Sequence, residues 1–84
     1  MMLTKGQLVR ATAGGEKGEW FAVLYEKDGF AYLINGKRHR ADNPKKKNVK
    51  HLAATKTILA ENELTDNKLR KALNRIKSEP AVTN

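Results

Sequence analysis

The chain has 84 residues, a formal net charge of +8 and no cysteine. This length allows one small domain with a modest core, and the lack of cysteine excludes a disulfide framework and a thiolate metal site. No segment approaches the ~18 apolar residues of a membrane span, and the opening MMLTKGQLVR lacks the apolar run of a signal peptide. We therefore expect a cytoplasmic protein with no membrane partner.

The excess positive charge is concentrated in one segment of the chain. Residues 1–34 carry as many acids as cations, whereas residues 35–56 hold eight cations and one acid. A surplus that served only solubility would be dispersed, with both signs mixed. A concentrated surplus is typical of a protein that binds a polyanion.

Short strands are predicted in the first half of the chain. Residues 7–13 alternate in polarity, and residues 20–26 are aromatic and aliphatic on both faces. A glycine-rich loop at 14–18 separates them. The turn signal Lys27-Asp28-Gly29 then leads into a third strand at 30–34.

An Asn35-Gly36 pair follows the third strand and predicts a tight hairpin. It would pair residues 30–34 with Lys37–Ala41 and so place four basic residues on a strand. Asn43-Pro44 turns the chain again, before a last short strand at 50–54. Five short strands without an intervening helix predict a mainly β fold, a small antiparallel barrel over residues 1–56.

The end of the chain is predicted to be helical. We expect a linker at 57–64, an amphipathic helix at 65–79 with Thr65 as its N-cap, and a disordered tail at 80–84. The apolar positions of the helix share one face: Leu69, Ala72, Leu73 and Ile76. A helix this short is marginal alone in water, so this stripe should dock on the barrel.

The stretch from Gly6 to Leu24, GQLVRATAGGEKGEWFAVL, resembles the KOW motif of ribosomal and transcription-elongation proteins. The matching positions are Gly6, Val9, Ala11, Gly14, Lys17, Gly18 and Val23. One departure is Phe21, where the motif commonly has glycine. The wider span from about Thr4 to Leu52 is similar to bacterial KOW-domain RNA-binding proteins and to a family of archaeal and eukaryotic large-subunit ribosomal proteins. The resemblance implies an SH3-like barrel that binds RNA, with ribosomal RNA or the ribosome as the partner.

The candidate RNA contacts are basic, because lysine and arginine neutralise phosphates and release condensed counterions. They are Arg10, Lys17, Lys37, Arg38, Arg40, Lys45, Lys46, Lys47 and Lys50, with Lys71 and Arg75 in a secondary role. The alternatives are loop lysines that are merely solvated and an edge strand kept charged against aggregation.

Aromatic residues bear on the kind of RNA that is bound. Trp20 is a candidate for stacking on an unpaired base, the alternative being a place in the core or beneath the helix. Most of the other aromatics are expected in the interior; they are Phe21, Tyr25, Phe30 and Tyr32. This favours recognition of folded RNA through phosphates and shape over a row of stacking platforms.

Catalysis and metal binding find little support in the sequence. The only histidines are His39 and His51, and the second alternates with Val49 and Ala53 as a partly buried structural residue would. The glycine loop also lacks the order of a nucleotide-binding loop.

The sequence therefore predicts a non-enzymatic protein that binds structured RNA, without a cofactor, a metal or a small-molecule substrate. A protein-docking module on the ribosome or the transcription machinery is the alternative, and nonspecific DNA binding is a third possibility. The composition does not specify an oligomeric state.

Overall fold

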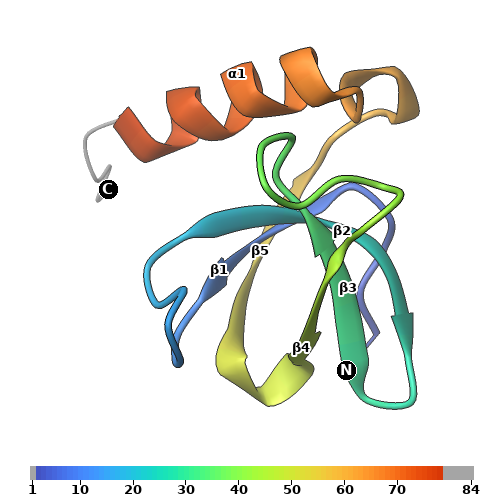
Figure 1. Ribbon diagram of the computed structural model, residues 1–84, viewed down its shortest axis with the longest axis vertical. Coiled ribbons are helices and arrows are strands. Elements are labelled where there is room, and N and C mark those ends of the chain that lie inside the picture. The colour runs from blue at the N-terminus through green and yellow to red at the C-terminus, as the bar shows by residue number, and fades with distance from the viewer. Residues whose placement is uncertain (1, 79–84) are drawn as a thin grey trace.

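The structure, a computed structural model, describes residues 2–78. The predicted tail at 80–84 lies outside the described residues. The elements run in the order β1 (Gln7–Ala11), β2 (Trp20–Lys27), β3 (Phe30–Ile34), β4 (Lys45–Asn48), η1 (Val49–His51), β5 (Leu52–Ile58), η2 (Glu61–Glu63) and α1 (Asp66–Ser78). Figure 1 shows α1 lying across one end of the sheet.

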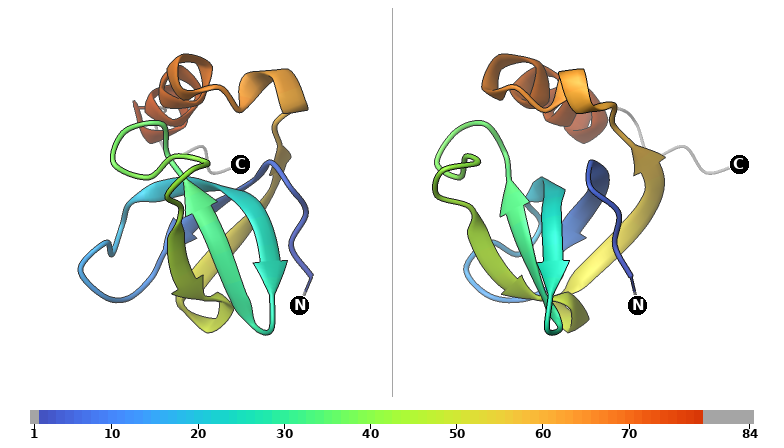
Figure 2. Two further views of the ribbon diagram at one scale, coloured as in Figure 1. Left: turned by 45° about the vertical axis from the view of Figure 1, so that its right-hand side comes forward. Right: turned by 90° about the vertical axis from the view of Figure 1, so that its right-hand side faces the viewer.

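The five strands form one antiparallel sheet in the order β4-β3-β2-β1-β5. The sheet curls, and the right-hand view of Figure 2 shows β4 and β5 on opposite sides of the curl. Their ladders do not join across the described chain, so the sheet is open between these two edges. The predicted mainly β class with a C-terminal helix is confirmed, and the barrel is an unclosed one.

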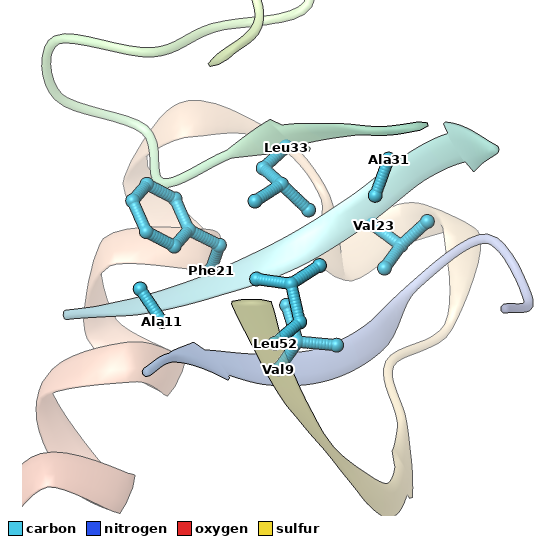
Figure 3. Close-up of a cluster of buried hydrophobic side chains, with 7 residues drawn as sticks. All are labelled: Val9, Ala11, Phe21, Val23, Ala31, Leu33 and Leu52. Atoms are coloured by element: carbon cyan, nitrogen blue, oxygen red, sulfur yellow. The ribbon is translucent and has the colours of Figure 1, made fainter. Parts of the chain in front are cut away.

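The concave face of the sheet encloses the main core. Alternate residues of a strand point to opposite faces, so the inward positions of β1, β2 and β3 meet one another and Leu52 of β5. The cluster, drawn in Figure 3, consists of Val9, Ala11, Phe21, Val23, Ala31, Leu33 and Leu52. Ala11 at the end of β1 and Phe21 near the start of β2 belong to this cluster, so it anchors both strands that flank the glycine loop.

A second core lies on the outer face of the same strands, under α1. Leu8, Ala22 and Ile34 point outward and pack against Leu69 and Leu73 of the helix. The predicted apolar stripe of α1 and its docking on the sheet are therefore confirmed. The helix has 13 residues, and the described chain contains no helix that is long and apolar enough to span a membrane.

The β2–β3 turn lies where the sequence predicts a turn, at Asp28 and Gly29. Asp28 and Gly29 have φ values of 53° and 82°, and Lys27 pairs with Phe30. Positive φ at both central residues is what a two-residue type I′ hairpin requires.

The predicted hairpin at Asn35-Gly36 is wrong. Gly36 has a φ of 76°, but Asn35 does not have a positive φ, so a type I′ turn cannot form there. Instead the Asn35 side chain accepts hydrogen bonds from the backbone N–H groups of Lys37 and His39, at 2.9 and 3.1 Å. The chain makes a long excursion over residues 35–44, and β3 pairs with Lys45–Asn48.

The expectations for the segments that follow this loop are also partly wrong. Residues 45–47, expected in a loop, form strand β4, and the last strand begins at Leu52 and extends to Ile58. The segment expected as a linker, 57–64, is partly regular, since it contains the end of β5 and η2. Leu59 also donates its N–H to the carbonyl of Gly6 at 2.9 Å, which ties this segment to the sheet.

Candidate nucleic-acid interface

A cleft of about 310 Å³ opens between α1, the start of β2 and the loop that follows β3. Trp20 forms part of its wall, and one acid, Glu19, also lines it. The cations that line the cleft are Lys37, Arg38, Arg70 and Lys77. Residues that are more than thirty positions apart in the sequence thus meet at one positively charged depression.

The excursion over residues 35–44 is held against the beginning of α1, as its position in Figure 1 indicates. A side chain at Gly36 would place its Cβ 2.5 Å from the carbonyl oxygen of Asp66, so only glycine allows this approach. Arg70 donates from Nη1 to the Gly36 carbonyl at 3.4 Å. Arg40 reaches both ways: its Nε donates to the Lys37 carbonyl at 3.0 Å and lies 3.6 Å from Asp66 Oδ2. These contacts place Lys37 and Arg38, the two residues that follow Gly36, at the rim of the cleft.

Trp20 is the only tryptophan of the chain and the first residue of β2. Its ring is partly buried against the outer core, in line with the structural interpretation of the sequence, and it also lines the cleft. Stacking of a base on the ring stays a prediction. Across the ladder it pairs with Arg10. Residues paired in this way project from the same face of the sheet, which puts another exposed cation beside the ring.

One face of α1 forms a wall of the cleft, and these helix residues were not among the candidates predicted from the sequence. Arg70, Leu73, Asn74 and Lys77 line the cleft, and they follow the i, i+3, i+4, i+7 spacing of one helix face. This spacing, which runs beside the apolar stripe of the helix, is the feature of the sequence that could have identified them. Lys71 and Arg75 lie elsewhere, in a shallow hollow with Lys68 and Glu63.

Lys45 and Lys47 are engaged with an acid of the glycine loop. Their Nζ atoms lie 3.0 and 2.9 Å from the two carboxylate oxygens of Glu16. Hydrogen bonds from Lys47 and then Lys45 lower the pKa of Glu16 from 4.5 to about 2. The backbones of both lysines pair with core positions of β3, so this ion triad connects the edge strand β4 to the glycine loop. The side chain of Lys47 is only 9% exposed.

Lys46 points to the other face of β4, among aromatic residues. Its Nζ lies 4.6 Å from the centroid of the Phe30 ring, a cation–π geometry. Tyr25 and Tyr32 stack beside it with centroids 4.4 Å apart, and Tyr25 is 47% exposed.

The expectation that these aromatics lie in the interior is wrong except for Phe21, which is fully buried. The physical reason is a register shift in the β2–β3 ladder between Val23 and Tyr25. It puts Tyr25 on the outer face, where it pairs with Tyr32, and alternation along β3 places Phe30 on that face as well. The helix packs over Leu8, Ala22 and Ile34 instead.

The remaining candidates, Lys17 and Lys50, do not line the cleft. Lys17 is exposed beside Gly18 in the glycine loop, and Lys50 is exposed in η1. Next to Lys50, Val49 donates its N–H to the Gly29 carbonyl at 3.1 Å, so η1 sits by the β2–β3 turn, at the end of the sheet away from α1.

The two histidines lie in different environments. His51 is exposed, so the prediction of a partly buried residue is wrong, whereas His39 is half-buried with its ring 5.9 Å from that of Phe21. Residues 2–78 contain no group of three side chains that could hold a metal ion.

Comparison with protein-family models gives no match for this chain, and neither does comparison with curated proteins. The arrangement of the cleft is therefore the main guide to function. Cations around an aromatic ring can hold a phosphate and a planar base in adjacent positions.

Proposed function

We propose that the protein binds structured RNA without catalysis, with ribosomal RNA as the first candidate. The observation that carries the proposal is the cleft, where four cations from the 35–38 loop and from α1 line the same depression as the only tryptophan. The resemblance of Gly6–Leu24 to the KOW motif supports the same function, as does the concentration of charge in residues 35–56.

The cleft extends into a wider basic surface. Arg10 is the cross-strand neighbour of Trp20, and Lys17 adjoins the cleft residue Gly18. Each phosphate that a cation neutralises adds roughly 0.7–0.9 to the slope of log K against log salt. About five contacts would lower the affinity on the order of a hundredfold for a fourfold rise in salt. Lys45 and Lys47 should contribute less, because Glu16 already neutralises part of their charge.

A protein-docking function is the second candidate, and one observation favours it. Tyr25 is exposed on the outer face of the sheet and stacks on the half-buried Tyr32, and tyrosine is enriched at protein interfaces. This surface is distinct from the cleft, so variants can separate the two functions.

The test is RNA binding by a cleft variant and by a variant of equal charge. Arg38→Ala/Lys77→Ala removes two cations that line the cleft. Fluorescence anisotropy with a labelled, folded ribosomal RNA fragment should show affinity falling about tenfold and the salt slope falling by about 1.5, as expected for two lost phosphate contacts.

The matched control is Lys27→Ala/Lys56→Ala, which lowers the net charge equally at two exposed positions outside the cleft. We expect a much smaller loss of affinity from this pair. Equal losses in the two variants would mean that the charge acts diffusely and that the cleft is not the interface. Failure of the unmodified protein to bind any folded RNA at low salt would refute the proposed function.

A further inference from the structure

We infer that the cleft holds one unpaired nucleotide of the bound RNA, with its base against Trp20 and its phosphates on the surrounding cations. This inference rests on the proposed function and specifies the structural element that the RNA must present.

The size of the cleft argues for a single nucleotide. Its volume of about 310 Å³ lies at the lower end of the roughly 300–1,000 Å³ of small-molecule sites. A double helix cannot enter such a space and can only contact its rim. A base that leaves the helix can enter, because it is flat and has two faces available for stacking.

The position of Trp20 gives the base a place to stack. The Trp20 ring packs against the outer core, which includes Leu73 of the helix. The same ring also lines the cleft. An anchored ring loses little conformational freedom when a ligand stacks on it. The structure thus provides a preorganised aromatic wall rather than a mobile one.

The polar groups of the cleft match the two halves of a nucleotide. Lys37 and Arg38 enter from one wall, and Arg70 and Lys77 enter from the other, so phosphates on either side of the unpaired residue can each meet a cation. Glu19 is the exception, since a carboxylate repels phosphate. It can accept hydrogen bonds from the amino group of a base, which gives this acid a role in a nucleotide pocket that it lacks in a site for phosphate alone.

The experiment uses three RNA hairpins that differ at one position. The first is fully paired, the second carries a single bulged adenosine, and the third carries an abasic residue at the bulge. Because Trp20 is the only tryptophan, the intrinsic fluorescence of the unmodified protein reports directly on the cleft. The adenosine bulge should bind about tenfold more tightly than the paired hairpin, as one stacked base provides, and should quench the fluorescence.

The abasic bulge separates stacking from flexibility of the backbone. It should lose the gain in affinity and the quenching. Trp20→Leu should lower the affinity for the adenosine bulge about tenfold, and Trp20→Phe should keep most of it.

Two results would contradict the inference in different ways. Equal binding of all three hairpins, or an abasic bulge as tight as the adenosine bulge, would remove the nucleotide pocket and leave RNA binding intact. Absence of binding to every hairpin at low salt would refute the proposed function and the pocket together.

Discussion

Glu16 changes how the three consecutive lysines at 45–47 are interpreted. The sequence KKK at 45–47 reads as a free phosphate-binding loop, but two of its lysines hold the Glu16 carboxylate. The acid lies about thirty positions upstream, in the glycine loop. The ion triad of Glu16, Lys45 and Lys47 is largely structural, since it joins the glycine loop to the edge strand β4.

This ion triad predicts a dependence of stability on pH. Because the pKa of Glu16 is lowered to about 2 in the folded protein from its usual 4.5, the unfolded chain binds more protons between these values. The stabilisation is complete above pH 4.5 and is lost as the pH falls toward 2. Glu16→Gln should lower the free energy of unfolding by about 1–2 kcal/mol at neutral pH, and by progressively less at lower pH.

Urea unfolding of the unmodified protein and the variant between pH 2 and pH 7 measures this difference. Glu19→Gln is the matched control, since it removes a carboxylate from the same loop that forms no ion pair within residues 2–78. A pH-independent difference between Glu16→Gln and the unmodified protein would show that the triad does not stabilise the fold.

At the scale of elements, the excursion over residues 35–44 and helix α1 form the cleft together. The excursion contacts the helix through Gly36, Arg40 and Arg70. The loop also has hydrogen bonds of its own, since Asn35 and Gly36 both donate their N–H to the His39 carbonyl, at 2.8 and 3.1 Å. Its contacts with the helix fix its position relative to α1, so the cleft should be lost when these contacts are disturbed.

Gly36→Ala tests this dependence, with Gly29→Ala as its control. Both glycines have a positive φ, 76° and 82°, so both substitutions cost about 1–2 kcal/mol of backbone strain. Only at Gly36 would the new Cβ meet the helix, 2.5 Å from the Asp66 oxygen, whereas Gly29 has open space. Gly36→Ala should lose about 1–3 kcal/mol more in urea unfolding and should also weaken RNA binding. Equal losses of stability at both positions would mean that the loop and the helix are not coupled.

At the scale of the whole molecule, the sheet carries a core on each face. β1, β2 and β3 contribute Val9, Phe21 and Leu33 to one core and Leu8, Ala22 and Ile34 to the other. The same strands therefore link both cores, and we expect the sheet and the helix to unfold as one cooperative unit.

Leu69→Ala tests this cooperativity. Leu69 is fully buried in the outer core, so its truncation should cost about 2–5 kcal/mol, a large part of the roughly 4–13 kcal/mol expected for a domain of this size. Trp20 fluorescence and far-ultraviolet circular dichroism should report the same urea transition. Ile58→Ala, at a position that is 54% exposed, should change the midpoint little. A fluorescence transition that precedes the loss of circular dichroism would show that the helix detaches separately.

Much of the fold was predictable because it depends on local patterns. Alternation placed Val9 and Ala11 inward, and the spacing of Leu69, Leu73 and Ile76 identified the docked face of α1. The hairpin at Asn35-Gly36 failed because its dipeptide is compatible with another turn, in which the asparagine side chain accepts two backbone hydrogen bonds. Because the hairpin was wrong, the strand expected at 37–41 was wrong as well.

The candidate site was less predictable than the fold. Trp20, Lys37 and Arg38 were recognised from residue type, but Arg70 and Lys77 became cleft residues only through the docking of the helix. The exposed Tyr25, which stacks on Tyr32, was missed because hydrophobicity does not tell which part of a sheet face a helix will cover.

Residue order and composition are enough to specify the strand periods, the helical stripe and the basic centre of this chain, because each depends on neighbours in the sequence. Which lysines remain available to a ligand is a different matter. Glu16 engages Lys45 and Lys47 across about thirty positions, and the cleft joins residues 37–38 to residues 70–77. Such charges meet only when the chain folds, so the location of the proposed site is a property of long-range packing.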